Sequence, residues 1–270
     1  MPGLSITSTS MSSSRFSYPD ADTSIYSSDG ILFRLHRINI TLNSHIPLQD
    51  GRLPESSRIL ELLFQFLYNQ PQPDLAELTF AVLLPLAEAA HKYRVYAAIS
   101  SCRNAIRCLI PAHSLPILSA ALKWKDRSLV DEAAKHTIAL SAEEIVRSLD
   151  SAYLAPWILY HRSWMSALSA ALRFRDPISR HWEGTKDQVG AKPMANPCEV
   201  WTELWATVAF DLEGHPEKLI DGGSIWRRAR ETLGLRCTAC EVWLDEWEAE
   251  FTWRMGKVPG FWEVAFGKNI

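Results

Sequence analysis

Apolar residues alternate with polar ones in one stretch near the start of the chain and recur at helical spacing through most of the remaining sequence. After the turn signal Ser28-Asp29-Gly30, every second position is apolar, at Ile31, Phe33 and Leu35. Period two is typical of a strand with one buried face, and Asp-Gly favours a tight hairpin turn. Because Ile25 precedes the turn, the pattern predicts a β-hairpin followed by a short helix.

Helical spacing begins after a loop that the Pro, Gly and polar residues of 46–56 predict. The apolar stripe that follows Ser57, a candidate helix cap, predicts one amphipathic helix. Residues 78–109 form the longest helical region. Pro85 interrupts it, either by opening a helix at its first turn or by kinking one.

The rest of the chain is predicted to be helical, with short polar breaks. Ser141-Ala-Glu-Glu144 and Thr238-Ala-Cys-Glu241 are capping boxes, and Asn196-Pro197 is a favourable helix start. The expected helices cover 114–123, 128–138, 141–149 and 150–174, with others starting near 196, 224 and 238.

These elements predict a helix-rich α+β protein with a small sheet at the front and only helices behind it. The N-terminal residues are rich in Ser and Thr and poor in core-forming side chains, which favours a disordered tail. The predicted divisions are a tail at 1–20, an α/β domain at 21–112, a helical extension at 113–175, a linker at 176–195 and a C-terminal helical segment at 196–270.

Composition excludes several classes of protein. The chain has 270 residues, 47% of them hydrophobic and 22% charged, and a net charge of -3. That charge argues against a general nucleic-acid binder, and the longest apolar runs are too short for a membrane span. Five cysteines, an odd number, without an export signal favour reduced thiols inside the cell, in cytoplasm or nucleus. Cys102 and Cys108 are expected to be buried small hydrophobes.

The sequence carries no motif of a known catalytic arrangement. Its only adjacent glycines, Gly222-Gly223, are not followed by Lys-Ser or Lys-Thr, so a phosphate loop is missing. His36 is expected to be a structural histidine at a strand-to-helix junction, hydrogen-bonded to backbone, since no orienting acid is visible. We therefore predict a non-enzyme with no catalytic residue and no cofactor, and keep a small enzyme of unknown class as an alternative.

Cys237 and Cys240 form the one pattern with distinct chemistry. Two thiolates at this spacing can hold one edge of a zinc site, for which Cys198, His181 and His215 are candidate further ligands. Two structural thiols and a redox pair are the other interpretations, and structural thiols are favoured because the ligand spacing matches no standard finger. We assign no metal ligand, and a zinc-stabilised helical adaptor remains an alternative.

Tryptophan is abundant, with 11 residues, of which ten lie from Trp157 onward. Two pairs at i, i+4 spacing predict buried faces of their helices. Trp253 and Trp262, near the end, are the expected contact residues. The pairs are Trp201 with Trp205 and Trp243 with Trp247.

Several segments, in order, resemble a BTB/POZ domain. Asp22 to Asn39 is similar to the opening of that domain, with its strand, Asp-Gly turn, Phe33 and His36. The segments similar to the following helices and to the helical tail of many mushroom-type fungal members are Ile59–Tyr68, Ala87–Tyr93, Leu154–His161 and Cys237–Cys240 with Trp247.

The resemblance implies a small sheet flanked by helices that is used for self-association or for docking a protein partner. It implies no catalysis, no cofactor, and no nucleic-acid, membrane or small-molecule partner. The usual domain has a further helix and strand where this chain has only the short stretch from His45 to Arg58, so we expect a reduced sheet. The usual dimer surface depends on the first strand and the first helix, and the shortening affects whether it forms in the usual way. Pro85, inside the matching helix, is a second departure from the family pattern.

Overall fold

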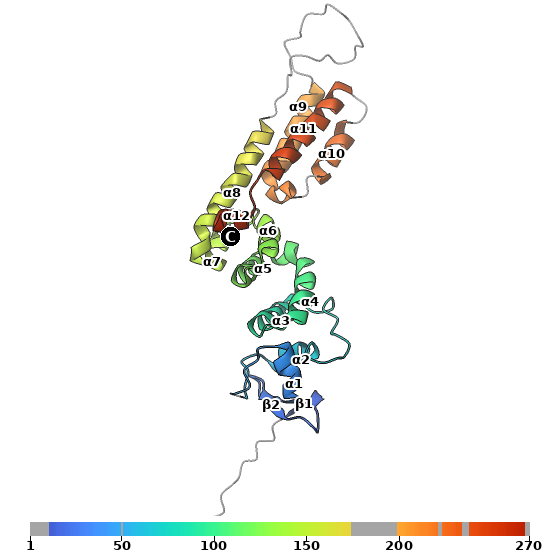
Figure 1. The fold of residues 1–270 in the computed structure, drawn as a ribbon. Coiled ribbons are helices and arrows are strands. Elements are labelled where there is room, and N and C mark those ends of the chain that lie inside the picture. The colour runs from blue at the N-terminus through green and yellow to red at the C-terminus, as the bar shows by residue number, and fades with distance from the viewer. Residues whose placement is uncertain (1–10, 50, 174–198, 221–222, 234–237, 268–270) are drawn as a thin grey trace, which may run out of the picture. The chain divides into compact units, whose positions relative to one another are not determined.

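A computed structural model describes residues 11–49, 51–173, 199–220, 223–233 and 238–267. The chain divides into two compact units, Met1–His113 and Ser114–Ile270, and each is described by itself (Figure 1). One helix, α5 (Ile110–Trp124), contains the boundary, and its backbone is non-helical at His113.

The first unit carries a three-stranded sheet in the order β1-β3-β2. The predicted hairpin is confirmed: β2 (Thr23–Tyr26) and β3 (Leu32–Leu35) are antiparallel, with Ile25 opposite Phe33. Gly30 has a φ of +82°, which other residues rarely adopt, so Asp-Gly supplies the turn as expected. An isolated bridge from Tyr26 to Arg52 extends the β2 edge. The sheet is therefore small, in agreement with the expectation from the short 45–58 region.

The prediction of a disordered tail over 1–20 is wrong for its second half. Residues Ser12–Ser17 form β1, which runs parallel to β3. Composition misled because backbone pairing with a distant strand needs few apolar side chains, and one fully buried aromatic, Phe16, is enough to hold this strand. Residues 1–10 lie outside the described part of the chain.

An aromatic cluster fills the space between the sheet and the helix α2 (Ser57–Gln65). The ring of Phe16 lies 6.3 Å from Phe33, 5.8 Å from Phe64 and 5.7 Å from Tyr68. Phe33 and Phe64 meet edge-to-face at 5.2 Å. Such tilted and edge-to-face pairs are the favoured aromatic geometries, so β1, β3 and the first core helix share one hydrophobic centre.

The helices of the first unit are α1 (Arg37–Asn43), α2 (Ser57–Gln65), α3 (Phe80–Lys92) and α4 (Tyr96–Arg107). The helix expected after the hairpin is confirmed, and the helical region expected over 78–109 forms α3 and α4. Pro85 lies in the middle of α3 and not at its first turn.

The start of α2 is held by the hairpin turn. Ser57, expected as the cap, is the first helical residue, and Ser56 occupies the cap position without a side-chain hydrogen bond. The backbone amide and hydroxyl of Ser57 both donate to the Asp29 carboxylate, at 2.8 and 2.6 Å. The hydroxyl groups of Ser27 and Ser57 lower the pKa of Asp29 to about 2. Asp29 therefore caps α2 from a distant turn.

We expect the Asp29→Ala substitution to lower the free energy of unfolding of the first unit by about 1 kcal/mol at neutral pH, the usual value of a helix cap. The folded pKa lies below the ordinary one, so this stabilisation is present above pH 3.8 and is lost as pH falls towards 2. Urea titrations followed by circular dichroism across that range measure it. Ser28→Ala, an exposed neighbour in the same turn, is the control, and an equal loss in both variants would contradict the capping role.

The second unit is entirely helical in its described residues. The expected helices are confirmed there, including the Ser141–Glu144 capping box, in which both hydrogen bonds are present. The start at Asn196-Pro197 and the linker at 176–195 lie outside the described residues. The elements are α6 (Arg127–Lys135), α7 (Ala142–Ser148), α8 (Ser151–Leu172), α9 (Glu199–Gly214), η1 (Pro216–Leu219), α10 (Gly223–Leu233), α11 (Thr238–Gly256) and α12 (Phe261–Phe266).

Tryptophans form the core of this unit around α11. Trp201, Trp226 and Trp247 are almost completely buried, and the ring of Trp247 lies 5.9 Å from Trp201 and 5.3 Å from Trp226. The indole NH of Trp247 donates to the carbonyl of Ala171 in the last turn of α8, at 3.0 Å. The predicted burial of Trp201 and Trp247 is thus confirmed, while Trp205 and Trp243 are only partly covered.

The expectation that Trp262 is an exposed contact residue is wrong. It is only 7% exposed, because α12 packs against α8 and α6. The backbone amide of Trp262 donates to the Asp131 carboxylate at 2.7 Å. A Cβ on Gly260 would lie within 3 Å of that carboxylate, so a larger residue there would require the Asp131 side chain to move. A chain-terminal position does not by itself predict exposure.

Candidate interaction surface

The outer face of α1 exposes two large aliphatic side chains one helical turn apart. Ile38 is 60% exposed and Leu42 is 73% exposed. They are at i, i+4 spacing, which places them side by side on one face. Ile40 lies on the opposite face and is fully buried. An aliphatic pair on the water-facing side of a short helix gains free energy only when another surface covers it.

Several hydrogen bonds fix α1 to the rest of the first unit. The amide of Arg37 donates to the Asp22 carboxylate at 2.6 Å, at the start of the helix. At its end, the side-chain amide of Asn43 donates to the carbonyl of Leu67 at 3.1 Å. Because both ends are anchored and Ile40 is buried in the core, the outer face is presented in one orientation, which lowers the entropy cost of binding.

His36 lies at the junction of β3 and α1, as expected, but its ring does not bond to backbone. Its Nδ1 lies 3.3 Å from the hydroxyl of Tyr68, which also accepts a hydrogen bond from the His36 amide. Nε2 lies 3.3 Å from Asp20, and Tyr18 packs against the ring at 4.9 Å. Burial raises the pKa of Tyr68 above its usual range. The expectation of a backbone bond missed Tyr68, which is 32 residues away in sequence. The described contacts make His36 a structural link between three segments.

The outer edge of β1 is a second unpartnered feature of this unit. β1 is at one end of the sheet and pairs only with β3, and among the described residues no further strand pairs with it. Met11, immediately before it, is 72% exposed. An open strand edge offers backbone donors and acceptors to a strand from another chain.

A groove of about 600 Å³ lies between the segment before α2 and the middle of α3. Glu55 and Glu88 both line it, and the Glu55 carboxylate accepts hydrogen bonds from the Tyr93 hydroxyl at 2.6 Å and from Lys92 at 2.7 Å. Burial and the nearby Glu55 raise the pKa of Tyr93 to about 12. These two hydrogen bonds link the segment before α2 to the C-terminal end of α3.

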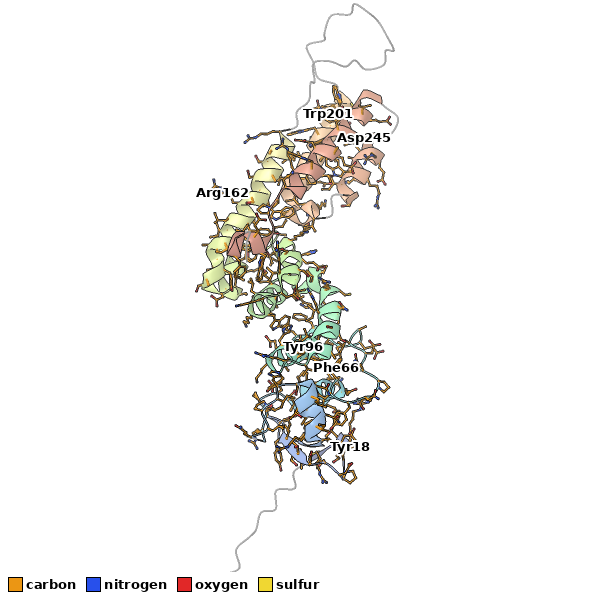
Figure 2. The ribbon with its side chains drawn as sticks, viewed as in Figure 1. Tyr18, Phe66, Tyr96, Arg162, Trp201 and Asp245 are labelled. Carbon is orange, nitrogen blue, oxygen red and sulfur yellow. The ribbon has the colours of Figure 1, made fainter. Side chains whose placement is uncertain are left out.

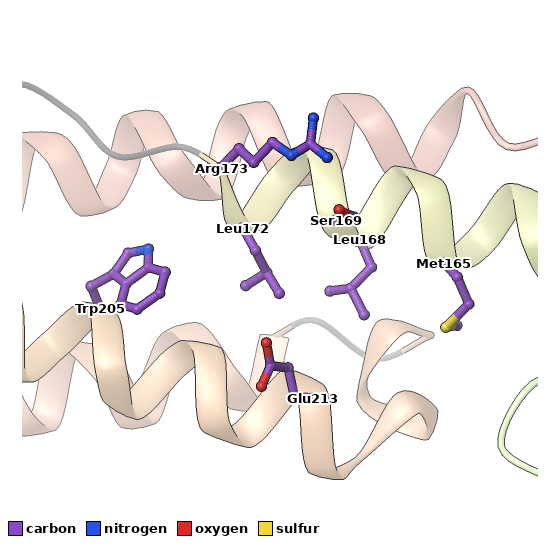
Figure 3. A pocket seen from close by; sticks show the side chains of 7 residues that line it. All are labelled: Met165, Leu168, Ser169, Leu172, Arg173, Trp205 and Glu213. Atoms are coloured by element: carbon purple, nitrogen blue, oxygen red, sulfur yellow. The ribbon is translucent and has the colours of Figure 1, made fainter.

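In the second unit, a cavity of about 530 Å³ separates α8 from α9 (Figure 3). Leu168 and Leu172 of α8 point towards α9, which contributes Trp205 and Glu213. The other lining residues are Met165, Ser169 and Arg173, and the Arg173 side chain is turned away from α9 (Figure 3). We assign no chemistry to this cavity, whose only carboxylate among the lining residues is that of Glu213.

The zinc interpretation rests mainly on residues outside the described part of the chain, which are Cys237, Cys198 and His181. Cys240 is buried in α11, and His215 is exposed, with Nδ1 3.0 Å from a Glu217 oxygen. Within the described residues, no group of three or more His, Cys, Asp or Glu side chains is placed to hold a metal ion.

Two other expectations concern single residues. Cys102 is buried as predicted, and burial raises the pKa of its thiol to about 12, which keeps it unreactive. Cys108 is exposed, contrary to expectation. Trp253 is 58% exposed, as expected, and its role as a contact residue stays a prediction. No helix among the described residues is long and apolar enough to cross a bilayer.

The α1 pair was not singled out by the sequence pattern. Apolar residues occupy every second position at Ile38, Ile40 and Leu42, which resembles the pattern of a strand. If the segment is read as a helix, the same pattern puts apolar residues on both of its faces, and this signal could have identified an outward-facing apolar surface. No protein-family model, curated protein or solved structure matches this chain.

Proposed function

We propose that the first unit is a BTB/POZ-like protein-interaction module that binds a second copy of this chain through the outer face of α1. The observation that carries the proposal is the pair Ile38 and Leu42, exposed on a helix whose ends and inner face are fixed. In this proposal the unit binds protein and carries out no reaction.

A second copy is the favoured occupant because the surface suits a two-fold interface. In such an interface the same patch lies on both sides, so an aliphatic pair meets an identical pair. A stable interface buries about 800 Å² on each partner, which is more than a seven-residue helix offers. The proposal therefore needs further area, for which the open edge of β1 and the exposed Met11 are the candidates.

The residues that resemble the family support the same proposal. The hairpin with Phe33, the junction at His36 and the helix that contains Phe64 share one core in the structure. We also propose that the protein works in cytoplasm or nucleus. Cys102 and Cys108 are both free thiols, which fits a reducing compartment.

The Leu42→Asp substitution is expected to weaken self-association about thirtyfold, because a charge would be buried without a partner in the centre of the interface. Sedimentation equilibrium of the full chain over a range of concentrations measures the dissociation constant. Ile38→Asp is expected to have a similar effect.

Tyr96→Asp is the matched control, since Tyr96 is 68% exposed on a different helix of the same unit (Figure 2). It should leave the dissociation constant within about twofold, as most surface substitutions do. Equal effects of Leu42→Asp and Tyr96→Asp, with all variants folded by circular dichroism, would refute the assignment of this face.

A further inference from the structure

A groove of about 570 Å³ runs between α8 and the end of α11 in the second unit. The α8 positions that line it recur at helical spacing and form one face, with an exposed leucine at one end and small residues along the floor. The opposite wall comes from α11 and the turn after it. The lining residues are Leu159, Arg162, Ser163, Ser166, Ala167, Ala170, Trp253, Arg254, Lys257, Val258 and Pro259.

Two large apolar side chains at this groove face water. Leu159 is 55% exposed and Trp253 is 58% exposed, although tryptophan is among the residues that most favour burial in an interface. The other tryptophans of α11 and α9 either lie in the core or are partly covered, so Trp253 is exposed despite neighbours that readily bury indole rings. A wall of exposed Leu and Trp over a floor of small residues accepts apolar side chains from another molecule.

The charge of the groove has one sign. Its lining includes Arg162, Arg254 and Lys257 and no acidic residue. Arg254 forms an ion pair with Glu250, whereas Arg162 projects from α8 (Figure 2) and no carboxylate in the described part of the chain lies within ion-pair range of it or of Lys257. Lys257 Nζ lies 5.5 Å from the centre of the Trp253 ring. The chain as a whole is negative, with a net charge of -3, so the groove is a local basic site.

We propose that this groove binds an acidic segment of a partner protein, with an aromatic or leucine side chain of that segment against Trp253 and its carboxylates on Arg162 and Lys257. Opposite charges at the rim fix the orientation of the segment and speed its encounter. Burial of the apolar side chain supplies most of the affinity. A single-stranded nucleic acid is less favoured, because two unpaired cations and one exposed ring cannot follow a phosphate backbone over several nucleotides.

The test starts from phage-displayed random dodecapeptides selected on the full-length chain. We expect the enriched peptides to combine Asp or Glu with Phe, Trp or Leu, and to weaken in binding as salt is raised. An enriched peptide is then synthesised with a fluorescent label, and its dissociation constant is measured by anisotropy against variants of the protein.

Trp253→Ala is expected to weaken binding about thirtyfold, and the double variant Arg162→Glu, Lys257→Glu at least about tenfold, with loss of the salt dependence. Arg227 is an exposed arginine on α10 that does not line the groove. The Arg227→Glu substitution should change the dissociation constant of the peptide by less than about twofold.

Three results would overturn the proposal. The first is enrichment of peptides that have no excess of Asp or Glu. The second is an equal dissociation constant for the groove variants and for the Arg227→Glu control. The third is displacement of the peptide by oligothymidylate that binds the protein at least as tightly as the peptide does. Because Leu42 lies in the first unit, failure of this test leaves the proposed self-association untouched, and the reverse also holds.

Discussion

Replacing Phe16 by alanine should lower the free energy of unfolding of the first unit by about 3–5 kcal/mol, as expected for a fully buried phenylalanine. The ring is 0% exposed and contacts Phe33 of β3, Phe64 of α2 and Tyr68 just after α2. Its removal leaves a cavity at the point where β1 meets the core. The loss is a large part of the total stability of a domain of this size.

The absence of tryptophan before Trp124 makes this measurement specific. Indole fluorescence reports on the second unit alone, while circular dichroism reports on both. In a urea titration, the unfolding transition of the first unit is the one seen by circular dichroism but not by fluorescence. We expect its midpoint to fall by about 2 M urea in the Phe16→Ala variant. Arg15→Ala, exposed in the same strand, is the control. If Phe16→Ala and Arg15→Ala are equally stable, β1 is not part of the folded core.

The second large effect is expected at Trp247. Trp247→Ala removes the centre of the aromatic cluster on α11 and the hydrogen bond from its indole NH to Ala171. We expect a loss of about 3–5 kcal/mol in the free energy of unfolding of the second unit. Trp247→Phe keeps much of the packing and loses the hydrogen bond, so its cost should be smaller, about 1–3 kcal/mol.

Trp253→Ala provides the matched control for this series, because Trp253 lies on the same helix but is 58% exposed. Its effect on stability should stay within about 0.5 kcal/mol. Tryptophan fluorescence during urea unfolding measures all three variants. A loss at Trp253 as large as that at Trp247 would contradict the placement of the core on one side of α11.

Local patterns predicted those parts of the fold that depend on local chemistry. The Asp29-Gly30 turn specifies the hairpin because few residues other than glycine accept the backbone angles at Gly30. The Ser141–Glu144 box forms because both partners lie within one helical turn. Helix-rich α+β architecture follows from such signals, and the structure confirms it at that level.

Features that depend on distant partners could not be predicted in this way. β1 forms because β3 pairs with it and Phe64 covers Phe16, and neither is visible from the serine-rich residues 11–17 themselves. Likewise, Asp29 rather than Ser57 caps α2, across 28 residues of chain. The candidate surface on α1 was missed for the same reason, since only the packing of Ile40 shows which side of the helix faces outward.

In the proposed self-association, α1 is covered by a second copy of the chain. Hydrogen–deuterium exchange of the full chain at low and high protein concentration tests it directly, because a dilute sample dissociates. We expect the amides of residues 37–43 to exchange more slowly in the concentrated sample, while those of 96–107 exchange equally in both. Identical exchange of residues 37–43 at the two concentrations would contradict the claim.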